Sequence, residues 1–231
     1  MAGAVAAMLL VLLPLAGRAA ADLVRDFDLI ALRREFAHNA AARVLKWEGP
    51  VRIHIDRRAY IGAEDLAFLQ RHISTLYAVT AVEMTYVRDA VDSNFRILFV
   101  AREEFQRAVM ESYEGNPETV RQVARRASCL TLFEGDGGPL VRATVVIQVD
   151  RARARGLLRR CMVEETTQSM GLVNDSREVG PSLFNDATYQ VVELNDHDRS
   201  LLRMLYHPRM RAGMNREDAL GIAREILPEV R

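Results

Sequence analysis

Residues 161–172 have the sequence Cys-Met-Val-Glu-Glu-Thr-Thr-Gln-Ser-Met-Gly-Leu, and this stretch decides the fold prediction. At helical spacing, one stripe carries Leu157, Cys161, Glu164, Gln168 and Leu172. Glu164, Glu165 and Gln168 therefore continue an apolar stripe. Carboxylates in that position must be solvated in a cleft, paired or bound to a metal, because burying a lone charge is costly. The alternative is that the stripe leaves the core at Glu164 and both carboxylates face water.

The flanking sequence extends this helix in both directions. Asp150 is a plausible helix cap and Gly171 a natural stop, so a single helix is predicted over about residues 151–170. Residues 173–195 then form a long irregular segment rich in Asn, Asp, Ser and Gly. Loops of this length in a compact domain are usually functional.

Strand patterns precede the helix and helix patterns follow it. Strands are predicted over residues 51–55, 82–87, 95–100, 129–133 and 143–149, the last two as a hairpin or as neighbours. Further helices are predicted over residues 27–42, 64–78, 103–113, 198–206 and 215–226. We therefore expect one α+β domain over residues 22–231, with one mixed, twisted sheet of about four or five strands packed on helices.

Composition excludes several classes of partner. The chain has 231 residues, of which 49% are hydrophobic and 27% charged, as in a folded globular protein. Basic and acidic residues number 31 each, so no net charge attracts nucleic acid or an acidic membrane surface. The sequence has no Gly-rich phosphate loop, Cys-x-x-Cys pair or long heptad run.

The first 21 residues resemble a secretory signal. An apolar run over residues 8–15 is followed by small residues and by Ala19-Ala20-Ala21, which predicts cleavage after Ala21. An N-terminal membrane anchor is the alternative, although the run is shorter than the roughly 20 residues that a span needs. We expect a periplasmic or secreted protein with no stable membrane span after cleavage.

The predicted export determines the expected redox state of the two cysteines. In an oxidising compartment, Cys129 and Cys161 predict one disulfide. Two buried free thiols are the alternative.

The pattern Glu164-Glu165-x-x-Gln168-x-x-Gly171-Leu172 resembles the H-E-x-x-H-x-x-G-L motif of metzincin-type zinc peptidases. In those enzymes two histidines bind zinc, the glutamate acts as general base, and the chain turns at the glycine toward a third ligand, whose position falls on Asn174. Residues 182–184 and 194–206 are similar to that family's Met-turn and closing helix.

A closer resemblance is to an exported bacterial family catalogued as domain-of-unknown-function family 2927. Its motifs match residues 161–175, 182–186 and 205–208, and the likeness covers most of the mature chain. The resemblance implies a zincin-like fold and leaves the activity open.

The zinc-ligand positions depart from the peptidase pattern. Glu164, Gln168 and Asn174 replace histidines, and the five histidines offer no pair four residues apart. Amides are poor zinc donors, and a general base without a metal-activated water has little to act on. Only Glu165 keeps its place, so we expect zinc-dependent peptidase chemistry to be lost and no resident cofactor.

Two functional hypotheses follow, with one structural alternative. The first is a non-catalytic module that binds a peptide, a glycan or another envelope protein. The second is a peptidase-like hydrolase with Glu165 as general base and a harder divalent ion, because oxygen donors suit calcium, magnesium or manganese. The candidate donors are Glu164, Glu165, Gln168, Asn174, Asp175, Asn185 and Asp186. Alternatively, Glu165, Gln168, Asn174 and Asn185 form a buried hydrogen-bond network that ties the loop to the helix.

Overall fold

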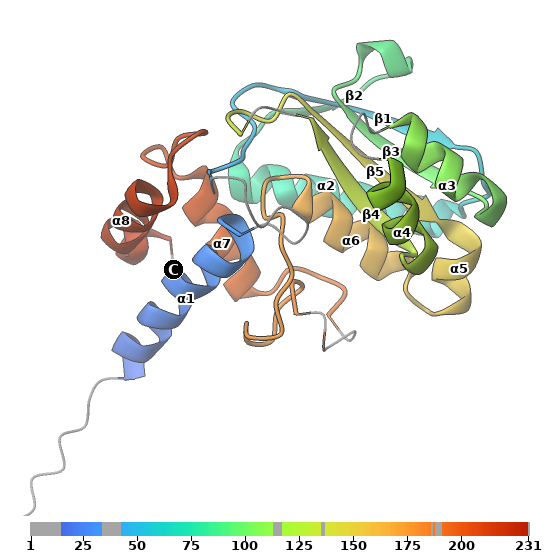
Figure 1. Ribbon diagram of the computed structural model, residues 1–231. Coiled ribbons are helices and arrows are strands. Elements are labelled where there is room, and N and C mark those ends of the chain that lie inside the picture. The colour runs from blue at the N-terminus through green and yellow to red at the C-terminus, as the bar shows by residue number, and fades with distance from the viewer. Residues whose placement is uncertain are drawn as a thin grey trace, which may run out of the picture.

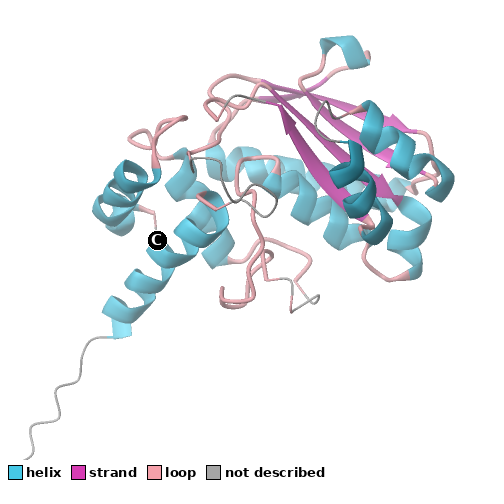
Figure 2. Cartoon of the chain, viewed as in Figure 1, coloured by secondary structure: helices cyan, strands magenta, loops and turns pink. Residues whose placement is uncertain are grey.

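The computed structural model describes residues 15–33, 43–112, 117–134, 137–185, 187 and 191–230. The elements in chain order are α1 (Leu15–Ala31), β1 (Val51–Arg57), α2 (Ala63–Thr80), β2 (Met84–Tyr86), the 3₁₀ turn η1 (Ala90–Asp92), β3 (Phe95–Val100), α3 (Arg102–Glu111), α4 (Pro117–Arg126), β4 (Cys129–Glu134), β5 (Arg142–Gln148), α5 (Val149–Ala154), α6 (Leu158–Gln168), α7 (Asp196–Tyr206), α8 (Arg216–Ile226) and the 3₁₀ turn η2 (Leu227–Glu229). Figure 2 shows the strands gathered in one part of the molecule and helices around them.

The strands form one mixed five-stranded sheet in the order β2-β1-β3-β5-β4. The first four strands in this order run parallel, and β4 runs antiparallel to β5 at the edge of the sheet. The register sets Thr131 of β4 opposite Val145 of β5. The predicted α+β class, sheet size and pairing of the last two strands are confirmed.

Helices cover both faces of the sheet (Figure 1). Alternate side chains of a strand point to opposite faces, so Ile97 and Val145 join the large core that contains residues of α2 and α6, whereas Leu98 and Val146 join a smaller core with α3 and α4. Near the carboxyl end of the chain, α7 packs against both α1 and α2, and α8 packs against α1. The helix α6 lies beside β4 and β5.

The predicted single helix over residues 151–170 is wrong. The structure has two helices, α5 and α6, separated at Gly156, which adopts a left-handed φ of +68°. There the Leu157 amide donates to the Ala152 carbonyl at 2.7 Å, which closes the end of α5 in a glycine-dependent motif. The regular helix that carries the candidate residues is therefore only 11 residues long.

The structure tests only part of the predictions for the N-terminal residues. Residues 1–14, which contain most of the predicted signal, lie outside the described residues, as do residues 34–42 of the predicted first helix. The helix α1 instead covers Leu15–Ala31, and the predicted cleavage position after Ala21 falls within it. Over the ranges that the structure describes, no helix has the length and apolar character to cross a membrane.

A disulfide joins Cys129 at the start of β4 to Cys161 in α6. The two Cα atoms are 5.9 Å apart and the cysteines are separated by 32 residues along the chain. A cross-link over a loop of this length stabilises a fold by roughly 3–4 kcal/mol in the loop-entropy model. The predicted pairing is confirmed, and the free-thiol alternative is wrong for this structure.

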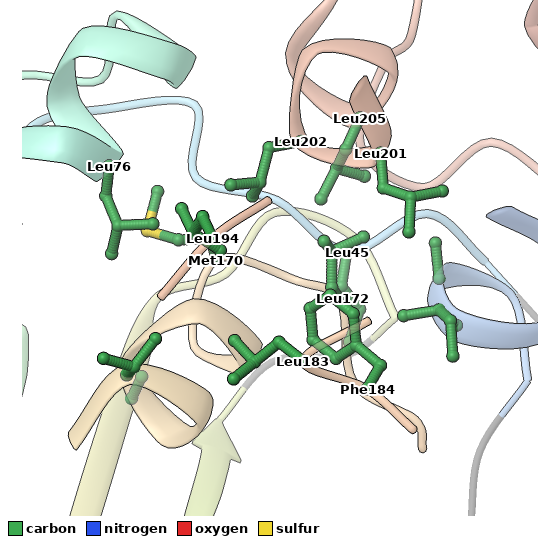
Figure 3. Packing of buried hydrophobic residues seen from close by; sticks show 14 of the residues in the cluster. Leu45, Leu76, Met170, Leu172, Leu183, Phe184, Leu194, Leu201, Leu202 and Leu205 are labelled. Carbon is green, nitrogen blue, oxygen red and sulfur yellow. The ribbon is translucent and has the colours of Figure 1, made fainter. Parts of the chain in front are cut away.

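The chain that follows α6 is packed tightly against the core. Gly171 has a φ of +109°, and a Cβ atom placed there would lie 2.0 Å from the Leu45 carbonyl oxygen. Beyond this close approach, Leu172, Leu183 and Phe184 are fully buried. Figure 3 shows these side chains among those of Leu45 and of Leu201 and Leu205 in α7. The long segment contains no helix or strand among its described residues, yet apolar side chains anchor it.

Candidate functional site

The candidate residues on α6 point in different directions because successive residues of a helix are rotated by about 100°. Glu164 and Gln168 are one turn apart and face the long loop. Glu165 faces the sheet, where its carboxylate Oε2 lies 2.7 Å from the Thr131 hydroxyl of β4. Glu165 is 6% exposed, and the same hydroxyl lies 2.9 Å from the Glu165 backbone oxygen. Glu165, the predicted general base, is therefore fixed against the edge strand.

Glu164 is engaged by a buried arginine on the preceding turn. Arg160 is 3% exposed, and its guanidinium lies 3.0 Å from the Glu164 carboxylate. The same guanidinium donates to the carbonyls of Leu183 and Val191 at 2.9 and 3.2 Å. Arg160 thus joins α6 to two points of the long loop. The sequence reasoning missed Arg160, although its spacing of four residues from Glu164 is typical of helical ion pairs.

The side chains of Gln168 and Asn174 also form hydrogen bonds within the protein. The Gln168 side-chain amide donates to the Asp175 carboxylate at 3.1 Å. Asn174 faces the end of α1, where its side-chain amide donates to the Leu29 carbonyl at 2.8 Å and its backbone amide to the Ile30 carbonyl at 3.1 Å. Asn174 therefore satisfies carbonyls that a helix end leaves without intrahelical partners.

The remaining candidates belong to the loop itself. The side-chain amide of Asn185 donates to the Val179 carbonyl at 2.8 Å, and its oxygen accepts from the Ala187 amide at 2.9 Å. Asp186 lies outside the described residues. Asn185 thus braces the loop internally.

These contacts determine whether the candidate residues can bind a metal ion. Glu164, Gln168 and Asn174, which the sequence comparison set against zinc ligands, contact Arg160, Asp175 and α1 respectively, and they offer a carboxylate and two amides. A guanidinium next to one donor repels a cation, and amides are weak zinc ligands. The donor set does not fit zinc. Throughout the described ranges, no group of three or more His, Cys, Asp or Glu side chains is arranged to hold a metal ion.

Comparison with known proteins assigns the chain to a family. The family model described as "Protein of unknown function (DUF2927)" matches residues 20–225, which include α6, the long loop and α7. The chain belongs to the DUF2927 family. No curated protein matches it.

A buried aspartate links the loop of this DUF2927 domain to α7. Asp198 is fully buried, and its carboxylate accepts from the Ser182 hydroxyl at 2.6 Å, from the Leu183 amide at 3.2 Å and from the Asn195 amide at 3.3 Å. Burial raises the pKa of Asp198, against the lowering effect of these hydrogen bonds. The Asn195–Asp198 pair is a capping box, and Asp198 belongs to the segment 194–206 that the sequence comparison matched to a closing helix.

His72 of α2 packs against α6 at Thr167, away from the side that faces β4. Its Nε2 lies 3.1 Å from the Thr167 hydroxyl oxygen, and that hydroxyl lies 2.6 Å from the Val163 carbonyl. Since the Thr167 proton is donated to Val163, the imidazole Nε2–H donates to Thr167. Burial, with the positive charge of Arg199, lowers the pKa of His72 to about 4. The DUF2927 domain therefore holds a neutral histidine between α2 and α6.

His72→Gln is expected to reduce the loss of stability on acidification. Because the folded pKa of His72 is about 4 and the ordinary value is 6.5, the unfolded chain takes up a proton first as the pH falls. The stabilisation by neutral His72 is complete above pH 6.5 and is lost toward pH 4. Between pH 7 and pH 5 the wild type should lose about 2 kcal/mol more than the variant in urea unfolding. An equal loss in both proteins would contradict this assignment.

Proposed function

We propose that the chain is an exported, zincin-like domain that has lost zinc-dependent peptidase chemistry and binds an extended peptide segment of an envelope protein. The observation that carries this proposal is the commitment of Glu164, Gln168 and Asn174 to three separate structural contacts. Side chains that hold the fold together in this way are not available to converge on one ion.

The arrangement of the sheet supports the zincin-like part of the proposal. In the resemblance described above, the position of Glu165 corresponds to the general base of the peptidase motif. Here α6 packs against the antiparallel edge strand β4, and Glu165 contacts that strand directly. The Cys129–Cys161 disulfide supports export, because such bonds persist in oxidising compartments.

The outer edge of β4 supports peptide binding. The Gln148 amide donates to the Ser128 carbonyl, which identifies residues 128 and 148 as a hydrogen-bonded pair. Such pairs alternate along an antiparallel ladder, so the backbone groups of Thr131 and Phe133 point away from β5. An extended peptide can add to an exposed edge through main-chain hydrogen bonds. Thr131 also holds Glu165, so the peptide would lie beside the remnant of the peptidase motif.

The test is a peptide titration monitored by nuclear magnetic resonance. Peptides that bind the full chain, with its disulfide intact, are first selected from a random displayed library. The selected peptides are then added to ¹⁵N-labelled protein. We expect the amides of Thr131 and Phe133 to shift and to exchange more slowly with solvent, whereas those of Leu130 and Leu132, which face β5, change little. Failure to select any peptide, or perturbation of a different surface, would overturn the proposal.

Glu165→Gln separates binding from catalysis. The glutamine oxygen can still accept from Thr131, so folding and peptide affinity should be retained. The hydrolase hypothesis is favoured by one observation, the carboxylate kept at position 165. If the wild type cleaves library peptides after addition of divalent ions and Glu165→Gln does not, the protein is a hydrolase and the binding-module proposal is wrong.

A further inference from the structure

A cavity lies on the opposite side of α6 from Glu165. It has a volume of about 230 Å³ and lies between α2, α6, α7 and the end of the long loop. Its wall contains Phe68, Arg71, His72, Thr75, Val163, Glu193, Leu194 and Arg199. The α6 residue in this wall is Val163, whereas Glu165 faces β4, so the cavity is separate from the candidate site described above.

Two arginines from different helices supply positive charge to this cavity. Arg71 extends from α2 with its guanidinium 6.0 Å from the centre of the Phe68 ring, and Arg199 extends from α7. Neither guanidinium forms an ion pair with a carboxylate anywhere in the described part of the chain. The positive charge of Arg199 acts on His72, another residue of the lining, because it contributes to the low pKa of that imidazole.

The remaining wall compensates only part of this positive charge. Glu193 is the one acidic side chain of the lining, and His72 is neutral near pH 7 because its pKa is about 4. Two arginines against one glutamate give the lining a net charge of +1. Phe68, Val163 and Leu194 supply apolar surface between the charged groups. Guanidinium groups in such a setting match the geometry of carboxylate and phosphate oxygens.

We propose that this cavity binds a small oxyanion, either phosphate or a small carboxylate, between Arg71 and Arg199. The volume of about 230 Å³ is below the usual range of drug-sized pockets, which restricts the ligand to a few non-hydrogen atoms. Because the cavity joins α2, α7 and the loop, a bound anion would link three segments that also pack around α6. This inference does not depend on the peptide-binding proposal, which concerns the other side of the helix.

The test uses inorganic phosphate and malonate as separate probes. Each is titrated into the ¹⁵N-labelled full chain at pH 7, with sodium chloride at equal ionic strength as the reference. We expect at least one probe to cause saturable shifts at Arg71, His72 and Arg199. Response to phosphate alone or to malonate alone identifies the source of the oxyanion. If neither probe causes a saturable response beyond chloride, the proposal is overturned.

Four variants sharpen the test. Arg71→Gln and Arg199→Gln should each weaken binding about tenfold, because each removes a charge-assisted hydrogen bond. Glu193→Gln should strengthen binding several-fold by removing a like charge. Arg203→Gln is the matched control, since Arg203 lies one turn further along α7, is exposed and does not line the cavity. Unchanged affinity in both Arg71→Gln and Arg199→Gln, or an equal loss in Arg203→Gln, would also overturn the proposal.

Discussion

Gly171→Ala is expected to lower the free energy of unfolding by more than about 4 kcal/mol, at the extreme of single substitutions. Two independent effects add. A Cβ atom at this position would lie 2.0 Å from the Leu45 carbonyl oxygen and 2.8 Å from its carbon, both of which are backbone atoms that cannot rotate away. The φ of +109° is in addition a conformation that side-chain-bearing residues rarely adopt.

Gly156→Ala is the matched control for this prediction. Gly156 also has a positive φ, of +68°, but a Cβ atom there has no other atom within 4 Å. Gly156→Ala should lower the free energy of unfolding by only about 1–2 kcal/mol, because it introduces left-handed backbone strain alone. Urea unfolding of both variants with the disulfide intact measures the difference. If Gly171→Ala costs no more than Gly156→Ala, the close packing of Leu45 on the turn after α6 is wrong.

Asp198→Ala is expected to destabilise the protein by about 3–5 kcal/mol. The substitution removes the acceptor of the Ser182 hydroxyl and of the Leu183 and Asn195 amides, all inside the protein. The Ser182–Leu183 turn would lose its bond to α7, so the loop should also become sensitive to proteases. Asp198→Asn keeps one acceptor oxygen and should have an intermediate effect.

Asp218 offers a comparison for Asp198 at the same position of another helix. It is the third residue of α8, its amide donates to the capping side chain of Asn215, and its own side chain is exposed. Asp218→Ala should therefore cost about 1 kcal/mol or less. Unfolding free energies and limited proteolysis of the two alanine variants give the test. Similar behaviour of both would show that the carboxylate of Asp198 does not hold the loop.

Hydrophobic periodicity predicted those elements whose burial is recorded in the local sequence. The alternation over residues 51–55 and the apolar run over residues 95–100 indicated strands that the structure contains, since burial of one or both faces leaves a direct trace in sequence. The disulfide was predictable because the chain has two cysteines. The helix α4 was missed because its sequence is polar and arginine-rich, so its one apolar face is narrow.

Long-range features of the candidate site could not be predicted in the same way. The contact between Glu165 and Thr131 depends on the position of β4 at the sheet edge, which no local pattern fixes. The break at Gly156 depends on a left-handed backbone that competes with an otherwise continuous helical pattern. The burial of Arg160 follows from loop carbonyls that fold over it, 23 and 31 residues further along the chain. The contacts of Glu165 and Arg160 join segments distant in sequence, whereas the break at Gly156 is local and depends on a backbone conformation that hydrophobic periodicity does not record.

The bond between Cys129 and Cys161 has a mechanical consequence for recognition at β4. Segments with few buried contacts open locally, and a ligand that binds such a segment must then order it. Here a covalent bond holds the first residue of the strand to the first turn of α6. The proposed docking edge would thus be preorganised before any encounter, and if the edge binds peptides as proposed, reduction of this one bond should weaken that binding even in a chain that remained folded.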